Sequence, residues 1–155
     1  MAKNIVISGA TGGIGSAIAK KFAIKQYDII LLGRDILKLE KLSESIRKDH
    51  KVKVKYYHCD ISITDSIVNS IESVINTVDS IELLVNATGV FPIAPIIKMR
   101  ERVYEECMDV NVRLPYLLSI GLFDCLRSQR GGKVINIGSS SSYKGFKNTV
   151  LYCTS

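Results

Sequence analysis

A glycine-rich turn near the start of the chain has the residue types needed to bind a diphosphate. Residues 8–15 read S-G-A-T-G-G-I-G and follow the short apolar run at 5–7. Glycines permit a tight turn, and the free N–H groups and dipole of a following helix attract phosphate charge. The turn is not a P-loop, because Ile14 stands where a P-loop has its second glycine. Dinucleotide binding is therefore predicted, against the alternative of a turn without a ligand, at Gly9, Thr11, Gly12, Gly13, Ile14 and Gly15.

Cysteine and histidine side chains are the other groups that could carry metal or redox chemistry. The two histidines are His50 and His58, and no two cysteines form a C-x-x-C pair. This spacing fits neither a zinc site nor an iron–sulfur cluster, so we expect no metal site. Because free cysteines are commonly core residues, we interpret the thiols as buried and reduced; they are Cys59, Cys107, Cys125 and Cys153.

Five short apolar runs have the length and composition of β-strands, at residues 5–7, 29–32, 52–56, 83–85 and 134–137. Four of them are almost continuously apolar, which is typical of parallel strands buried on both faces between helices. Segments with helical periodicity separate the runs, and Asp35 is a candidate N-cap for one of these helices. The alternation predicts an α/β fold: a doubly wound parallel sheet (Rossmann fold) in three αβα layers, with strand order 3-2-1-4-5.

Length and composition agree with one soluble domain. The chain has 155 residues, of which 46% are hydrophobic and 23% charged, and its formal net charge is +6. These values exclude a disordered or collagen-like chain, and no apolar run reaches the ~18 residues of a membrane-spanning helix. No linker or repeat divides residues 1–155, so we expect a single domain, in the cytoplasm, without a membrane partner. A basic stretch at residues 47–55 raises nucleic-acid binding as an alternative, which we do not favour because no binding module accompanies it.

Several motifs occur in an order that is typical of one enzyme family. The glycine turn is followed by Asp60 after the third predicted strand, by N-A-T-G at residues 86–89 after the fourth, and by D-V-N-V around Asn111. Ser139 follows the fifth apolar run, and Tyr152 comes after it at the family's spacing. Taken together, these motifs resemble the short-chain dehydrogenase/reductase family over the entire chain, with one departure, Ala87 in place of the second asparagine of the family's N-N-A-G turn.

The resemblance implies an oxidoreductase that transfers a hydride between NADP(H) and a small carbonyl or alcohol substrate. In this family a tyrosine, here Tyr152, donates or accepts the proton, while Ser139 holds the carbonyl and Asn111 completes the catalytic set. Dimers or tetramers are the usual assemblies, so a homo-oligomer is expected. The resemblance also implies further cofactor-binding residues beyond the glycine turn: Asp60, Ile61, Asn86, Ala87 and Gly89.

Residues 33–35, G-R-D, determine which nicotinamide cofactor we expect the chain to prefer. At the end of the second strand, an acidic side chain favours the ribose 2′-OH of NAD, whereas an arginine accommodates the 2′-phosphate of NADP. In the family pattern Gly33 stands at the usual acid position and Arg34 adjoins it, while Asp35 has the alternative role of a helix cap. We therefore predict NADP, with NAD less favoured.

The family pattern also has a lysine four residues after the tyrosine, where its charge favours the phenolate. Here Tyr152 is followed by C-T-S, and the lysine position would be residue 156, one past the last residue. The chain thus resembles the N-terminal part of such an enzyme, with C-terminal elements missing and the fifth strand as a sheet edge. We expect weak dinucleotide affinity with little or no turnover; a non-catalytic dinucleotide-binding module is the alternative.

Pro115 bears on the predicted role of Asn111. In a regular helix the N–H of residue 115 would donate to the carbonyl of residue 111, but proline has no N–H. In the family this asparagine is associated with a kinked helix and a water that links to the lysine, so Pro115 would expose the oxygen which that relay needs. A kink that only curves the helix around the core is the alternative.

Overall fold

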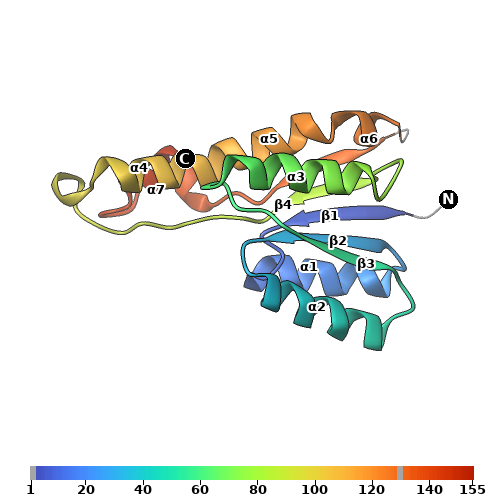
Figure 1. Ribbon diagram of the computed structural model, residues 1–155. Coiled ribbons are helices and arrows are strands. Elements are labelled where there is room, and N and C mark those ends of the chain that lie inside the picture. The colour runs from blue at the N-terminus through green and yellow to red at the C-terminus, as the bar shows by residue number, and fades with distance from the viewer. Residues whose placement is uncertain (1–2, 129–130) are drawn as a thin grey trace.

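The computed structural model describes residues 3–128 and 131–155, and in this part of the chain five parallel strands form one sheet (Figure 1). Their spatial order is β3-β2-β1-β4-β5, which confirms the predicted doubly wound arrangement. In the register, Ile5 of the central strand pairs with Ile29 on one side and Leu83 on the other. The strands are β1 (Asn4–Ser8), β2 (Asp28–Gly33), β3 (Val54–His58), β4 (Leu83–Asn86) and β5 (Lys133–Asn136).

Helices cover both faces of the sheet, so the molecule has three layers (Figure 1). α1 (Gly13–Ile24) and α2 (Ile36–Asp49) lie on one face. The opposite face carries α3 (Thr64–Ile75), α4 (Glu101–Met108), α5 (Leu114–Gly121) and α6 (Phe123–Arg127). The short helix α7 (Val150–Thr154) packs against α4. Within the described residues, none of the helices has both the length and the apolarity needed to cross a membrane.

Alternating side chains of β1 fill two apolar cores, one on each face of the sheet. Ile5 and Ile7 belong to the core under α1 and α2, whereas Val6 belongs to the core that Leu118 and Leu122 complete. Successive side chains of a strand point to opposite faces, and here both faces are covered. The continuous apolar run of β1 is therefore explained by burial of all five of its residues.

All four cysteines are predicted to be buried, and three of them contribute to this interior. Cys59, Cys107 and Cys125 are buried, while Cys153 is half-buried in α7. Burial raises the pKa of the Cys59 and Cys125 thiols, which keeps them protonated at neutral pH.

β5 forms an edge of the sheet in the described part of the chain, and its four residues are exposed. Val134 and Ile135 retain 41% and 43% of their accessible surface, although they are as apolar as the buried residues of β1. The structure thus agrees with the expectation of an apolar fifth strand at the sheet edge.

A π-turn (Asp109–Arg113) joins α4 to α5, and in it the Leu114 N–H donates to the Asp109 carbonyl five residues earlier. Pro115 follows as the second residue of α5. Because proline has no N–H, the regular α-helical bond to the Asn111 carbonyl is not made. The interruption predicted from Pro115 therefore takes the form of a π-turn that contains Asn111, a feature frequent at functional sites.

Candidate functional site

The loops at the carboxyl ends of the strands surround two adjoining hollows. The first, of about 260 Å³, is lined by the glycine turn and by the end of β2. The second, of about 510 Å³, is lined by Asn111, Ser139 and Tyr152. Thr88 and Gly89 line both hollows, so the two adjoin at these residues, and together they are called the cleft. The structure thus brings together, at the carboxyl ends of the strands, the glycine turn and the three residues predicted to be catalytic.

Two glycines of the turn are required by close backbone packing. Gly9 has a φ of +67°, and a Cβ there would lie 2.7 Å from the backbone of Ala87 and Thr88. A Cβ on Gly15 would lie 2.3 Å from the Gly9 carbonyl oxygen. The turn is therefore held against the loop after β4 on one side and against the start of α1 on the other.

The start of α1 suits an anionic ligand. Its N-cap is Gly12, which has no side chain to accept from the first-turn N–H groups, and the first turn contains no acidic residue. A Cβ on Gly13 would have no heavy atom within 4 Å, so the approach to this turn is open. Helix N-termini of this kind bind phosphate through free N–H groups and the helix dipole. Gly9, Thr11 and Gly12 line the first hollow, while Gly13, Ile14 and Gly15 form the first turn of α1.

Charged residues of both signs lie at the far end of the first hollow, where β2 leads into α2. Arg34, Asp35 and Lys38 all line it. One Asp35 carboxylate oxygen accepts from the Lys38 backbone N–H at 3.0 Å, and the other lies 3.2 Å from the Lys38 ammonium. These two contacts with Lys38 lower the pKa of Asp35. Asp35 is therefore the predicted N-cap of α2, and Lys38 is a cation of this hollow that the sequence prediction missed.

The loop after β3 contributes unequally to the same hollow. Ile61 lines it, as expected for a cofactor-binding residue, but Asp60 is not among its lining residues. The Asp60 carboxylate instead accepts from the backbone N–H and the hydroxyl of Ser62, at 3.0 and 2.8 Å. Burial acts to raise the pKa of Asp60, but these hydrogen bonds and the nearby charges of Arg34 and His58 lower it overall. Asp60 thus fixes its own loop beside the hollow.

A chain of polar side chains ties together the carboxyl ends of three strands. The Thr88 hydroxyl donates to the Ser8 hydroxyl at 3.1 Å, which donates to the Asn86 amide oxygen at 3.2 Å. The Asn86 amide nitrogen then donates to the Asn136 oxygen at 2.8 Å. Asn86 is 2% exposed, so its amide needs these partners. Of this network only Asn86 is predicted from the sequence as a site residue; the signal for the others is a polar residue at the end of each apolar strand.

Asn111 joins two segments that are distant in the sequence. Its side-chain amide oxygen accepts from the Val90 N–H at 2.9 Å, and its amide nitrogen donates to the Val90 carbonyl at 3.0 Å. The same nitrogen donates to the Ser155 hydroxyl at 2.8 Å. The side chain of Asn111 therefore holds the loop after β4 and the end of α7 to the π-turn.

Ser139 and Tyr152 line the second hollow from two different elements. Ser139 is the N-cap of a short 3₁₀ turn, η3 (Ser140–Ser142), and its oxygen accepts from the Ser141 N–H at 3.2 Å. Its hydroxyl hydrogen can still donate to a ligand. Tyr152 lies in α7, where its ring contacts Phe91 with centroids 4.4 Å apart, and within the described residues its hydroxyl has no hydrogen-bond partner. Two hydroxyl groups are thus available at this hollow.

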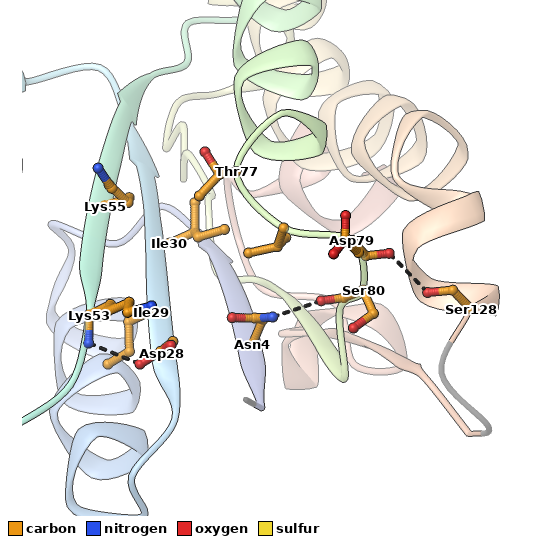
Figure 2. Close-up of a pocket in the computed structure, with 11 residues that line it drawn as sticks. Asn4, Asp28, Ile29, Ile30, Lys53, Lys55, Thr77, Asp79, Ser80 and Ser128 are labelled. Carbon is orange, nitrogen blue, oxygen red and sulfur yellow. Dashed lines mark hydrogen bonds between the residues drawn. The ribbon is translucent and has the colours of Figure 1, made fainter. Parts of the chain in front are cut away.

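A further hollow, of about 600 Å³, lies at the other ends of the strands, the amino ends of β1, β2 and β3 (Figure 2). Its polar groups hold the connections between elements. Asn4 donates to the Ser80 carbonyl, Ser128 donates to the Asp79 carbonyl, and the Lys53 N–H donates to Asp28. Ligands of doubly wound sheets bind outside the carboxyl ends of the strands, so the cleft described above is the candidate site.

Known proteins are similar to this chain over almost its whole length. A family model described as short chain dehydrogenase matches residues 3–155. Among curated proteins, the chain is 30% identical over 154 residues to a galactitol 2-dehydrogenase of Agrobacterium fabrum. That match covers 99% of the chain but 59% of the relative, so the chain spans about three fifths of the relative's length.

Two solved structures are similar to the chain and contain different nicotinamide cofactors. An alcohol dehydrogenase from Thermococcus sibiricus, complexed with 5-hydroxy-NADP, superposes with a TM-score of 0.94 at 25% identity, over 99% of this chain and 65% of that one. An NAD+-bound xylitol dehydrogenase superposes with a TM-score of 0.89 at 26% identity, over 98% of this chain and 58% of that one. Similar structures therefore bind nicotinamide dinucleotides of both kinds.

Proposed function

The chain belongs to the short-chain dehydrogenase family, and from that premise we propose that it binds NADP(H), in preference to NAD(H), for hydride transfer with a small carbonyl or alcohol substrate. The observation that carries this proposal is the pair of adjoining hollows. One has the open N-terminus of α1 beside it, the other has the hydroxyl groups of Ser139 and Tyr152, and Thr88 and Gly89 line both.

The preference for NADP(H) is supported by the charges at the end of β2. Arg34 is exposed and lines the first hollow, so its guanidinium is free to pair with a 2′-phosphate. Asp35, the residue that would favour the 2′-OH of NAD, already accepts from Lys38 through both carboxylate oxygens. A ribose hydroxyl would have to compete with those contacts, whereas a phosphate would meet Arg34 and Lys38.

When bound, the nicotinamide supplies or accepts the hydride. The residues of this chain transfer the proton and orient the substrate. In the reducing direction the Ser139 hydroxyl donates a hydrogen bond to the substrate carbonyl oxygen, and Tyr152 transfers its phenolic proton to that oxygen as the C–H bond forms. In the oxidising direction Tyr152 takes the proton from the alcohol.

The same family membership leads us to propose a homo-oligomer, a dimer or tetramer. Its support is an apolar stripe along the outer side of α5 and α6, where Tyr116, Ile120 and Phe123 keep 62%, 52% and 57% of their surface exposed. Contiguous apolar surface of this kind marks interaction sites. The mass of the protein in solution is the direct measurement.

Calorimetric titration of the 155-residue chain with NADPH and with NADH tests the proposed function. We expect NADPH to bind more tightly, and Arg34→Ala to weaken NADPH binding by about 10- to 100-fold, the value of a charge-assisted contact, while NADH binding changes little. The matched control is Arg127→Ala, an exposed arginine on α6 that lines neither hollow.

The reaction itself is tested by following NADP+ reduction at 340 nm with galactitol, the substrate in the name of the 30% identical relative, and NADPH oxidation with cyclohexanone. We expect any turnover of these 155 residues to vanish in Tyr152→Phe, because the proposed proton donor is then absent. No heat with either dinucleotide would contradict the proposal, and so would turnover that survives Tyr152→Phe unchanged.

A further inference from the structure

We propose that Phe91 is a positioning residue for Tyr152: its ring fixes the direction of the Tyr152 side chain, and the Asn111 amide holds the backbone near each ring through Val90 and Ser155. The inference rests on the proposed function for its catalytic meaning, but its geometry stands on contacts among the described residues.

The ring contact is the first observation. The Phe91 and Tyr152 rings have centroids 4.4 Å apart and planes inclined at 65°, an edge-on arrangement. Aromatic pairs favour this geometry because the positive edge of one ring meets the negative face of the other, and the preference adds to the burial of apolar surface. Tyr152 therefore has a contact with directional character, on a ring that lies at the second hollow.

Phe91 is itself held in place on both sides along the chain. Its predecessor Val90 is fixed by two hydrogen bonds to the Asn111 side chain, of 2.9 and 3.0 Å. Three residues after Phe91, the Ala94 N–H donates to the Asn148 carbonyl at 2.9 Å, which ties this loop to the segment just before α7. The backbone on both sides of Phe91 is therefore held in place, and the ring, with 52% of the residue's surface exposed, has its contact with Tyr152 from this fixed position of the chain.

Tyr152 needs such a contact because its own element is short. α7 has five residues, and a helix of that length has little stability of its own. The Tyr152 backbone is anchored through Ser155, whose hydroxyl donates to the Tyr152 carbonyl at 3.1 Å and accepts from Asn111 at 2.8 Å. The backbone anchor leaves the rotation of the phenol ring about χ1 undetermined, and the contact with Phe91 determines it.

The consequence is a single orientation of the proton donor. With χ1 fixed, the Tyr152 hydroxyl stays at the hollow that Ser139 also lines. Proton transfer requires the phenol oxygen within hydrogen-bonding reach of the substrate oxygen, and small misplacements of a reacting group reduce rates strongly. Loss of the Phe91 ring would leave Tyr152 in several rotamers and lower the fraction of protein ready to react.

The experiment measures the Tyr152 rotamer directly, by three-bond N–Cγ and C′–Cγ couplings in the isotope-labelled 155-residue chain. We expect one χ1 rotamer in the unsubstituted protein. In Phe91→Leu the ratio of that rotamer to the others should fall about 2- to 12-fold, the range expected for one aromatic pair. Phe91→Tyr, which keeps the ring, should restore the original couplings. Tyr143→Leu is the matched control, because Tyr143 is an aromatic residue of the neighbouring loop with 86% of its surface exposed.

Thermal unfolding and NADPH titration of the same variants separate this inference from the proposed function. We expect Phe91→Leu to retain the unfolding midpoint and to bind NADPH within about twofold of the original affinity, since Phe91 lines neither hollow of the cleft. Unchanged Tyr152 couplings in Phe91→Leu, or averaged couplings in the unsubstituted chain, would overturn the inference. Absence of NADPH binding in every variant would instead overturn the proposed function and leave the couplings to decide the positioning role.

Discussion

The two ends of the cleft are held by different kinds of contact. At the dinucleotide end, comprising residues 9–15 and 33–38, each turn leads at once into a long helix, the 12-residue α1 or the 14-residue α2. At the tyrosine end, comprising residues 89–91 and 138–155, Ser139 caps a three-residue turn and Tyr152 lies in a five-residue helix. Short elements depend on tertiary contacts for their shape. The tyrosine end is accordingly held by hydrogen bonds from Asn111, in the distant π-turn.

Because of this difference, we expect substitutions at the two ends to have different effects on the fold. The dinucleotide end is fixed by backbone packing against the central strands, so a steric change there disturbs the fold itself. The tyrosine end is fixed by a few side-chain hydrogen bonds on the periphery of the sheet, so their loss should disorder it locally while the sheet persists.

The largest effect is expected from Gly9→Ala, at the dinucleotide end. The new Cβ would lie 2.7 Å from the backbone of Ala87 and Thr88, and the residue would have to keep a φ of +67°. Backbone strain and overpacking together predict a loss of about 2–4 kcal/mol in the free energy of unfolding. Urea titration followed by circular dichroism measures this loss.

Gly13→Ala is the control for this substitution, because it adds the same methyl group in the same turn. A Cβ on Gly13 meets nothing within 4 Å, and the residue begins α1. We expect a change of less than about 1 kcal/mol, in the stabilising direction. Equal destabilisation by the two substitutions would mean that the close approach to Ala87 does not determine the turn.

A smaller, more local effect is expected from Asn111→Ala, at the tyrosine end. The substitution removes the hydrogen bonds to Val90 and Ser155 and leaves two Val90 backbone groups without their partner. One such loss costs about 1–3 kcal/mol. We expect hydrogen exchange of the Val90 amide, which donates to the Asn111 side chain, to accelerate by at least about tenfold, while the amides of β1 remain protected.

Asn69→Ala supplies the comparison for Asn111→Ala, since Asn69 is an exposed asparagine of α3. It should leave exchange at both ends of the cleft unchanged. If Asn111→Ala accelerated exchange in β1 as much as at Val90, the two ends of the cleft would belong to one cooperative unit and the contrast drawn between them would be wrong.

The same contrast explains how much the sequence predicts. The five strands follow from buried apolar runs, and the Asp35 cap follows from an aspartate at the start of a helical pattern. These are properties of neighbouring residues, which periodicity and local chemistry encode. The resemblance to the dehydrogenase family predicts Ser139 and Tyr152 as catalytic residues. The structure adds that both line one hollow with Asn111.

What the sequence could not predict depends on pairs of residues that are distant along the chain. The Ser8–Asn86–Asn136 hydrogen bonds require the ends of three strands to be adjacent, and the contact of Phe91 with Tyr152 requires the loop after β4 to meet α7. The role of Lys38 was missed for another reason. It pairs with Asp35 one helical turn earlier, but only the structure shows that both line the first hollow.

The smallest predicted effect concerns Asp35, whose carboxylate supports the start of α2 at the dinucleotide end. The hydrogen bond from the Lys38 N–H and the charge of its ammonium lower the pKa of Asp35 below the unfolded value of about 3.9. The stabilisation is therefore complete above about pH 4 and disappears as the pH falls through the lower, folded-state pKa. We expect the unfolding temperature of the unsubstituted chain to exceed that of Asp35→Ala by a few degrees at pH 6, and the difference to shrink below pH 4.

The control is Asp65→Ala, because Asp65 is an exposed first-turn aspartate of α3 for which no capping contact is seen among the described residues. A difference that persisted unchanged to pH 2 would show that the loss in Asp35→Ala comes from packing, and that the charged cap does not stabilise the dinucleotide end.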